Sequence, residues 1–396
     1  MFRSILILET VFWIAKATPD FYTLEEYKDL TDDLLKGYSN KIRPIWNQGQ
    51  SLPISVSLWV SSVNEVSAVD QRMSTTAYLY VTWIDESLWW NATETGIETM
   101  QFNQKDLWIP DIVLKNGFTA FQPLGGDFYY LYVESSGKVQ WYPYMVLESK
   151  CEIDVTYFPF DRQMCNIIFK TWSYSRLEVN LTVDENEIGF FDFVSNSVWE
   201  VTSMDAWDDV TNMETDVTFS IYLRRKPYYF IMSLVIPVIF LGLLNPVVFI
   251  IPADAGEKMG YAVTIFLTFV VFLTIVSTSL PANSDSISIM SIYLVIKLLI
   301  SALIIFISSL QLRLNHRKSS RKIPRFHASV VKCERRLRCI RNQIDTDDPD
   351  NYDKESKTAD IEWSDVSSAV DFFAFWIINI LDLSVTGIIF YLILSI

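Results

Sequence analysis

The sequence predicts an extracellular all-β sandwich with an N-terminal helix, followed by a four-helix transmembrane bundle. Three observations lead to this fold class. Residues 50–225 contain short runs in which apolar and polar side chains alternate, residues 228–396 contain four long apolar segments, and the N-terminus has the pattern of a secretory signal. The chain has 396 residues, half of them hydrophobic, which is enough for two domains.

The apolar segments cover residues 228–251, 259–280, 286–310 and 372–396. The first two contain no charged residue, the third contains only Lys297, and the fourth contains only Asp382. Each is longer than the ~20 residues that a helix needs to cross a hydrocarbon core of ~30 Å. We therefore expect four transmembrane helices.

The extracellular domain is expected over residues 18–226, after a signal peptide at residues 1–17 in which Arg3 precedes a mostly apolar stretch. Asn91 and Asn180 each begin an Asn-X-Thr sequon, which predicts glycosylation. Strands are predicted at residues 77–83, 139–147 and 217–223, where apolar and polar side chains alternate with a period of two. A helix is predicted at residues 22–38, where the apolar residues have helical spacing.

Charge is strongly segregated along the chain. Residues 18–223 carry 31 acidic and 12 basic residues, a balance of 12 − 31 = −19, which argues against nucleic-acid binding and suits a surface that attracts cations. Residues 312–341 carry 11 basic residues and one acid, Glu334, and such a segment after a span is expected on the cytoplasmic side. We therefore expect spans one to three within residues 227–311, a cytoplasmic segment at 312–371 and a fourth span at 372–396, in a multi-pass protein of the plasma membrane.

The cytoplasmic segment contains an apolar stripe at helical spacing with basic flanks, made by Val330, Cys333, Leu337, Ile340 and Ile344. The stripe predicts a helix that packs on a neighbour or lies at an anionic membrane face, and a solvated basic helix explains it equally well.

Cys151 and Cys165 are the only cysteines in the first three hundred residues. A disulfide between them would close a loop and stabilise the fold by roughly 3 kcal/mol, because it lowers the entropy of the unfolded chain. The loop contains Phe158-Pro159-Phe160-Asp161, which can support a cis turn. From these residues alone, a purely structural staple is as good an explanation as a functional loop.

One face of the second apolar segment differs from the others. Steps of three and four residues from its charged entrance connect Glu257, Gly260, Thr264, Leu267, Val271, Thr274 and Thr278. Such a face suits a water-filled pore, although Thr and Gly also serve helix packing in membranes. A ring of Glu257 carboxylates would select cations, and rings of Leu267 and Val271 would form a gate that dewets. One helix cannot enclose a channel, so this function requires an oligomer.

Several motifs together resemble those of the Cys-loop pentameric ligand-gated ion channels, on the cation-selective branch near nicotinic acetylcholine and serotonin type-3 receptor subunits. These motifs are Trp108-Ile-Pro-Asp111, the 151–165 loop, Thr171-Trp172, Arg225-Lys226-Pro227 and Gly256-Glu257-Lys258. The resemblance covers residues 20–310 and, more loosely, the last span. It implies a disulfide-closed loop, four further subunits in what we expect to be a homopentamer, a small-molecule agonist of unknown identity at subunit interfaces, monovalent cations as the permeating ions and membrane lipid as the surroundings.

The resemblance also assigns agonist-site residues. On the principal face it points to Trp172, Tyr174, Trp207 and, at a position that is usually aromatic, Lys115. On the complementary face it points to Tyr78, Tyr130, Tyr132 and Tyr142. Lys115 departs from the family pattern because a lysine repels a cationic ligand unless it is paired, and the adjacent cysteines of nicotinic principal subunits are absent from residues 203–216.

The resemblance places coupling between ligand site and pore at Val69, Phe158, Pro159, Asp161, Arg225 and Pro281. Asp161 and Arg225 are expected to form a buried ion pair. Lys258 is expected to point away from the pore lumen.

Three alternatives remain open from the sequence. The chain could be an accessory subunit that conducts only in heteromers, a receptor for a stimulus other than a neurotransmitter, or a membrane-tethered binding protein that does not conduct. An enzyme is not expected, because the only histidines, His316 and His327, lie in the basic segment and no nucleophile, metal or cofactor motif is present.

Overall fold

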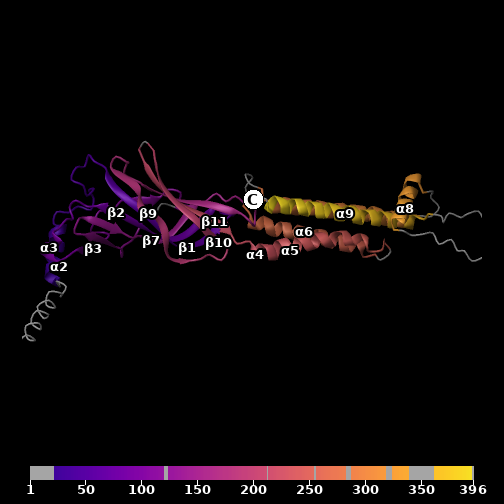
Figure 1. Cartoon of the computed structure of the whole chain (residues 1–396), viewed down its shortest axis with the longest axis horizontal. Coiled ribbons are helices and arrows are strands. Elements are labelled where there is room, and N and C mark those ends of the chain that lie inside the picture. Colours follow the sequence, from indigo (N-terminus) through magenta and orange to yellow (C-terminus); the bar gives the residue numbers. More distant parts are fainter. Residues whose placement is uncertain are drawn as a thin grey trace, which may run out of the picture. The chain divides into compact units, whose positions relative to one another are not determined.

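The computed structural model describes residues 22–119, 124–211, 213–253, 256–281, 287–317, 323–338 and 361–394. The chain divides into two compact units (Figure 1). The first runs up to Ile153 and continues through Arg162–Arg224, and the second contains Asp154–Asp161 and the chain from Arg225 onward. The predicted signal peptide, residues 1–17, lies outside the described residues.

The first unit is a β-sandwich with a helix at its start. Helix α2 (Leu24–Leu35) begins at Thr23, whose hydroxyl accepts a hydrogen bond from the Glu26 amide while the Glu26 carboxylate accepts one from the Thr23 amide. This reciprocal cap satisfies two amides that the first helical turn would otherwise leave unpaired. A second short helix, α3 (Ala92–Thr95), follows a loop at the end of β2.

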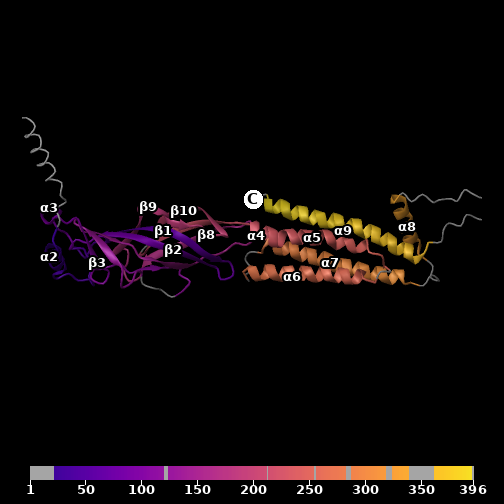
Figure 2. The same ribbon diagram turned by 90° about the horizontal axis from the view of Figure 1, so that it is seen from below.

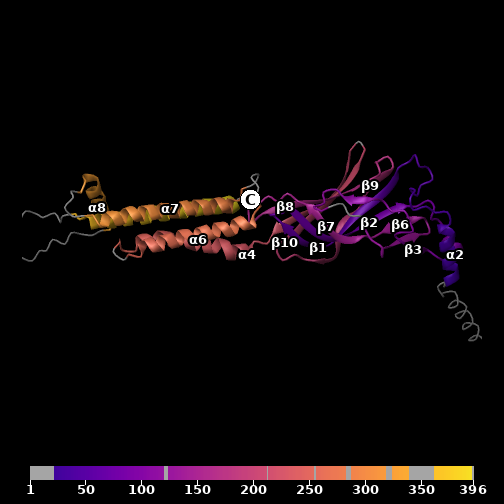
Figure 3. The ribbon, with the colours of Figure 1, turned by 180° about the vertical axis from the view of Figure 1, so that it is seen from behind.

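Two sheets form the layers of the sandwich, as Figures 1 and 3 show from opposite sides. The larger sheet has the order β3-β5-β6-β2-β1-β9, with β7 also paired to β2, and the smaller has the order β10-β11-β8-β4. The strands of the larger sheet are β1 (Leu52–Ser67), β2 (Arg72–Ile84), β3 (Thr99–Asn103), β5 (Tyr130–Glu134), β6 (Lys138–Trp141), β7 (Tyr144–Lys150) and β9 (Val179–Val194). The strands of the smaller sheet are β4 (Ile112–Leu114), β8 (Arg162–Thr171), β10 (Trp199–Val210) and β11 (Thr215–Arg225).

The alternation of side chains along the strands produces the core. Strand β8 is antiparallel to β11, and the register places Cys165, Ile167 and Phe169 opposite Ile221, Phe219 and Val217, all of them fully buried. The intervening residues of the same strands point to the other face of the sheet, where polar and charged side chains such as Lys170 and Asp216 lie; on β11 several of these, Asp216 among them, are also buried. The predicted sandwich and N-terminal helix are therefore confirmed.

The second unit contains the four predicted spans. Within the described ranges, four helices are long and apolar enough to cross a membrane: Tyr228–Phe249, Lys258–Ser279, Ile289–Asn315 and Trp363–Ile393. The first is built from α4 (Tyr228–Phe230), the π-turn η1 (Ile231–Val235), α5 (Ile236–Leu244) and the 3-10 turn η2 (Asn245–Phe249). The others are α6 (Lys258–Ser279), α7 (Ile289–Asn315) and α9 (Trp363–Leu394), which lie beside α5 in Figure 2.

The changes of helix type in the first span occur at its prolines. Pro237 lies at the second position of α5, directly after the π-turn, and Pro246 lies at the second position of η2. Proline lacks an amide hydrogen and clashes with the preceding helical turn, so a local switch of hydrogen-bonding pattern accommodates it.

The single charges of the apolar segments 286–310 and 372–396 pair with each other. Lys297 Nζ lies 2.5 Å from Asp382 Oδ1 and donates to Thr386 Oγ1 at 3.0 Å, and both charged side chains are buried. Gly242 of α5 completes this site, because a Cβ at that position would lie 2.8 Å from Lys297 Nζ. The pair therefore connects α7 and α9 at a point where a Cβ on α5 would force one of the two charged groups to shift.

The segment predicted to be cytoplasmic is partly helical. Helix α9 begins at Trp363, nine residues before the expected boundary at 372, and α8 covers Arg325–Leu337. Of the predicted apolar stripe, Val330 packs partly buried against the cluster that contains Trp363 and Val366, whereas Cys333 and Leu337 are exposed. The fully buried residues of α8 are Val331 and Glu334. Val331 packs against Trp363 and Val366 of α9, and Glu334 is buried in an ion pair with Arg338 at 2.7 Å, so the neighbouring helix selects a face that hydropathy alone does not. Ile340 and Ile344 lie outside the described residues.

Candidate functional site

The predicted disulfide between Cys151 and Cys165 is confirmed. Their Cα atoms are 5.1 Å apart, and both residues are buried. Cys165 lies on β8, so the disulfide attaches the start of the loop to the smaller sheet. The Phe158–Pro159 peptide bond inside the loop is cis, as the sequence allowed.

Residues 154–161 of this loop belong to the second unit, where they contact the entrance of the first span. Arg225 Nε lies 2.7 Å from Asp161 Oδ1 and Arg225 Nη2 lies 3.0 Å from Asp161 Oδ2, and both residues are buried. The guanidinium also lies over the Phe158 and Phe230 rings, 5.2 and 5.5 Å from their centroids. The expected buried ion pair is therefore present, in the bidentate geometry that fixes orientation as well as distance.

The same loop contacts the start of α7. The amide of Ile289 donates to the carbonyl of Thr156 at 2.9 Å. The loop thus contacts both the first span, through Phe158 and Phe230, and the start of the third, through Thr156 and Ile289. Pro281 directly follows α6 in the connection toward α7, and Val69 lies exposed in the turn between β1 and β2.

Trp172 lies at the end of β8 with 58% of its surface exposed. Its amide donates to the carbonyl of Asp111 at 3.1 Å, and the next amide, that of Ser173, donates to the Asp111 carboxylate at 2.6 Å. Asp111 therefore holds the backbone turn that presents the indole. Tyr174 turns the other way, because its hydroxyl accepts from Trp108 Nε1 at 3.3 Å and its ring packs on Trp108.

Two lysines accompany Trp172 on the outer face of the smaller sheet. Lys170 Nζ lies 5.5 Å from the centroid of the Trp172 ring and 3.1 Å from a carboxylate oxygen of Glu214. Lys115 is ion-paired with Asp216. Because the carboxylate offsets its charge, Lys115 does not repel a cationic ligand from this position. Trp207, on β10, is 41% exposed. The Lys170 ammonium occupies the position over the indole that an ammonium ligand would seek.

Lys170 was not among the residues that the sequence singled out. It stands two residues before Trp172, and residues two apart on a strand share a face. This spacing was the available signal, but the register that brings Glu214 and Asp216 beside it depends on the β8–β11 pairing.

The larger sheet carries an aromatic cluster that contains three of the four predicted tyrosines. The Tyr142 ring lies 6.0 Å from Tyr78 and 6.2 Å from Tyr132, measured between ring centroids. Tyr130 makes no ring contact with this cluster among the described residues and is exposed. Further members that the sequence reading missed are Trp59, Tyr80 and Phe191. Tyr80 follows Tyr78 by two residues, so the period-two pattern was sufficient to find it.

Burial shifts the pKa of two phenols in this cluster further above neutral pH, at which a phenol is already uncharged. It raises the pKa of Tyr142 to about 12, with a smaller contribution from the neighbouring Tyr80, and it also raises the pKa of Tyr78. The hydroxyl of Tyr142 donates to Gln140 Oε1 at 2.7 Å. The phenols therefore offer neutral ring faces, which attract cations through their quadrupoles.

The polar stripe of α6 is exposed in the single chain. Glu257, Gly260, Thr264, Leu267, Val271, Thr274 and Thr278 are all exposed, while Ala262, Ile265, Phe269 and Val276 face the other helices and are buried. The hydroxyls of Thr264 and Thr274 donate to carbonyls four residues earlier, so these side chains need no partner from a neighbouring helix.

Lys258, next to Glu257, is directed into the helix bundle. It is fully buried, and its Nζ lies 2.5 Å from Asp371 Oδ1 of α9 and over the Phe249 ring. The lysine charge is therefore neutralised on the far side of α6, and the exposed Glu257 keeps its own negative charge at the end of the stripe.

The chain was compared with known proteins. The sequence-family model of the neurotransmitter-gated ion-channel ligand-binding domain matches residues 27–227. The family model of the neurotransmitter-gated ion-channel transmembrane region matches residues 234–351. The chain belongs to the neurotransmitter-gated ion-channel family. Among similar proteins, the rat neuronal acetylcholine receptor subunit alpha-6 is 31% identical over 73% of this chain and 60% of the relative, and the rat beta-3 subunit is 32% identical over 78% of this chain and 68% of the relative. The chain thus spans about 60% of the length of the first of these relatives.

Membership in the neurotransmitter-gated ion-channel family confirms the predicted architecture: an extracellular ligand-binding domain precedes four membrane spans. The family consists of ligand-gated channels and not of enzymes, in agreement with the sequence. Its members form pentamers that bind neurotransmitter-like ligands. The roles of individual agonist-site and pore residues, and glycosylation at Asn91 and Asn180, remain predictions. The Asn180 carboxamide oxygen accepts a hydrogen bond from Thr215 at 3.0 Å.

Proposed function

We propose that this chain is a subunit of a cation-selective ligand-gated channel, a homopentamer in the plasma membrane, whose pore is lined by residues 257–278 of α6. The observation that carries the proposal is the separation of two adjacent charges. Glu257 is exposed at the end of the polar stripe, whereas Lys258 is buried against Asp371. Five such carboxylates around an axis would favour cations, and Leu267 and Val271 would form the apolar gate.

In this proposal a small-molecule agonist binds between subunits, where the exposed Trp172 side of one subunit meets the aromatic cluster around Tyr142 of the next. Agonist binding opens the pore because the agonist has a higher affinity for the open state, and the difference in affinity supplies the free energy of opening. The loop at 154–161 supports a route to the pore, since it contacts Arg225 before the first span and Ile289 at the start of α7.

The test is two-electrode voltage clamp on oocytes that express the chain alone, during application of candidate ligands and of different pH values. We expect currents whose reversal potential follows the sodium gradient and not the chloride gradient. Glu257→Gln should reduce cation selectivity, and Leu267→Thr should ease opening because it wets the gate. Ile275→Thr makes a similar apolar-to-hydroxyl change on an exposed position off the stripe and serves as the control. Currents carried by chloride, or equal effects of Leu267→Thr and Ile275→Thr, would refute the proposed pore.

A second candidate function is an accessory subunit whose principal face binds no agonist. Lys170 over Trp172 favours it, because it places a cation where an ammonium ligand would bind. Silence of the chain alone despite surface expression, followed by cation currents on co-expression with a partner subunit, would support this function over the homomer.

A further inference from the structure

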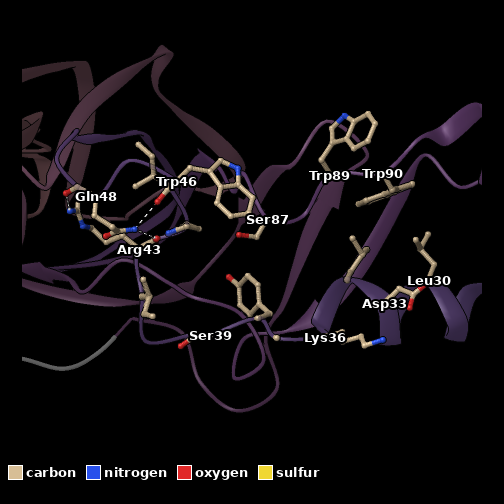
Figure 4. Close-up of a pocket in the computed structure, with 16 residues that line it drawn as sticks. Leu30, Asp33, Lys36, Ser39, Arg43, Trp46, Gln48, Ser87, Trp89 and Trp90 are labelled. Atoms are coloured by element: carbon tan, nitrogen blue, oxygen red, sulfur yellow. Dashed lines mark hydrogen bonds between the residues drawn. The ribbon is translucent and has the colours of Figure 1, made fainter.

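A cavity of about 660 Å³ lies between α2 and two loops of the sandwich in the first unit. Its lining includes Leu30 and Asp33 of α2 and the neighbouring residues Trp89 and Trp90, which precede α3. In Figure 4, Trp90 lies on the side of Leu30 and Asp33, and the Trp89 ring lies on the opposite side. Of two adjacent tryptophans, one is therefore directed toward α2 and the other away from it.

The exposure of the side chains alternates along this segment. Leu88 and Trp90 are buried, whereas Trp89 has 65% of its surface exposed and Asn91 is partly exposed. The backbone of Asn91 is extended, with φ −86° and ψ 99°, and side chains two residues apart on an extended chain point to the same side. Trp89 and Asn91 therefore share the solvent-facing side of the segment.

Hydrogen bonds fix the segment in place. The Trp90 amide donates to the Ser135 carbonyl at 3.2 Å, and the Trp90 indole N–H donates to the Ile97 carbonyl at 2.7 Å. The Asn91 carbonyl accepts from two amides of α3, both at 3.2 Å. The indole of Trp89 forms no hydrogen bond or ring contact in the part of the chain that the structure describes. A rigid backbone thus holds an uncovered indole beside Asn91.

Asn91 begins the sequon Asn91-Ala92-Thr93, and its carboxamide is oriented in a way that suits a glycan. The carboxamide oxygen accepts from the Thr93 amide at 3.2 Å and from the Thr93 hydroxyl at 2.8 Å. The amide nitrogen, which is the atom that carries an N-linked glycan, forms no hydrogen bond among the described residues. The oxygen alone caps α3, so a glycan on the nitrogen leaves the cap intact.

The second sequon lacks these features. Asn180 lies within β9, where its carboxamide oxygen accepts from the buried Thr215 hydroxyl at 3.0 Å. The Thr182 hydroxyl donates to the Ile54 carbonyl at 3.3 Å and not to Asn180. The residue two positions before Asn180 is Glu178, so a carboxylate stands where Trp89 stands beside Asn91.

We propose that the extracellular domain carries an N-linked glycan on Asn91 whose first N-acetylglucosamine packs against the Trp89 indole. The C–H bonds on one face of a pyranose ring carry partial positive charge, which is complementary to the negative face of an aromatic ring. The contact removes apolar indole surface from water. Because the sugar is attached two residues away, the contact is intramolecular and forms at a high effective concentration.

The attachment uses a preformed oligosaccharide that a transferase of the secretory pathway takes from a lipid-linked diphosphate donor. The bond between the anomeric carbon and the diphosphate oxygen breaks, and the diphosphate leaves with the bonding electrons. The anomeric carbon forms a new bond to Asn91 Nδ2, which loses one proton. The ligand-binding domain precedes the four spans and is extracellular, so Asn91 passes through the compartment that holds this donor.

The test uses the full-length protein in lipid nanodiscs, made in cells that attach only high-mannose glycans. Endoglycosidase H then leaves a single N-acetylglucosamine on Asn91, whereas peptide-N-glycosidase F removes the whole glycan and leaves an aspartate, which is an equally good helix cap. Hydroxyl-radical footprinting with peptide mass spectrometry measures the oxidation of each tryptophan. We expect Trp89 to be oxidised about 2-fold more slowly with the single sugar than without it, because one of the two faces of the ring is covered.

Trp46 is the matched control, because it is 80% exposed but lies outside the segment that carries Asn91. Its oxidation should be the same with and without the sugar. Thermal unfolding gives a second measurement. Removal of the single sugar should lower the unfolding midpoint, and this decrease should be smaller in Trp89→Ala, because that variant has no indole for the sugar to cover.

Three results would overturn the proposal. The first is an Asn91 that carries no glycan in the mature protein. The second is rapid oxidation of Trp89 both with and without the sugar, which would show that the ring stays bare. The third is slow oxidation of Trp89 under both conditions, which would show that a neighbouring subunit covers the indole. None of these measurements requires the channel to conduct, so the result is separate from the fate of the proposed pore.

Discussion

The Lys297–Asp382 pair allows a quantitative test of the membrane bundle. Asp382→Asn would leave the fully buried Lys297 ammonium without a counter-charge, with only neutral partners: the new amide oxygen, the Thr386 hydroxyl at 3.0 Å and the Tyr293 ring at 5.0 Å from its centroid. Breaking a buried pair by removing one member costs about 3–5 kcal/mol, whereas replacing both members by apolar residues is often neutral. The double variant Lys297→Met/Asp382→Leu should therefore recover most of the free energy of unfolding that Asp382→Asn loses. The interaction energy between the two sites in a double-mutant cycle should be about 3 kcal/mol.

The assay heats the protein and measures by fluorescence-detected size-exclusion chromatography how much of the monodisperse assembly remains. The midpoint is the temperature at which half of the assembly is lost. At ~2–4 °C per kcal/mol for a domain of this size, Asp382→Asn should lower the midpoint by ~6–20 °C. Ser384→Ala, on an exposed face of α9, is the control and should leave the midpoint unchanged. Gly242→Ala should also lower it, because the new Cβ would lie 2.8 Å from Lys297 Nζ. A double variant as unstable as Asp382→Asn would refute the reasoning, since the cost would then not come from an unpaired charge.

Three further predictions concern the extracellular domain and its loop. Lys170→Gln removes the ammonium that lies 5.5 Å from the Trp172 ring, so tetramethylammonium should bind about 3- to 30-fold more tightly, while Lys138→Gln on the other sheet should have no effect; an unchanged affinity would contradict the resident-cation interpretation. Tyr142 has its pKa raised to about 12 in the folded protein, against about 10 when unfolded, so its contribution to stability is complete below pH ~10 and is lost as the pH rises from about 10 to about 12. Thermal unfolding between pH 9 and 11.5 should then show a weaker pH dependence in Tyr142→Phe than in the exposed control Tyr130→Phe, and identical slopes would argue against the linkage. Asp161→Asn removes the carboxylate charge that faces the buried Arg225 and should destabilise the fold by ~3–5 kcal/mol, measured as lost surface expression that Asp161→Asn/Arg225→Met partly restores; no loss in the single variant would count against a buried charge pair.

The features that the sequence predicted correctly depend on local patterns or on unambiguous chemistry. Four segments almost free of charge predict four spans, because their length matches the membrane and no globular alternative needs such runs. Two cysteines with no competitor nearby can pair only with each other. The buried pair of Asp161 and Arg225 was found only through the family resemblance, since nothing in the spacing of 64 residues indicates contact.

The features that the sequence did not predict depend on which elements pack together. The buried face of α8 is chosen by Trp363 and Val366 of α9, and not by the apolar stripe of α8 itself. The contact of Lys170 with both Trp172 and Glu214 requires the register of two strands. The cavity between α2 and the sandwich is formed by three segments of the chain, and no single segment carries a recognisable motif.

The buried contact between Lys258 and Asp371 joins residues that are 113 positions apart. Because of this contact, a carboxylate of α9 compensates the positive charge at the start of α6. A chain interrupted in the basic segment, before Trp363, would retain the first three spans but would lack the carboxylate that compensates Lys258. The freed ammonium would then stand beside Glu257, and each subunit's net contribution to the local field would fall from one negative charge to zero. The sign of the electric field at this end of α6 is therefore set by a part of the chain that does not line the stripe.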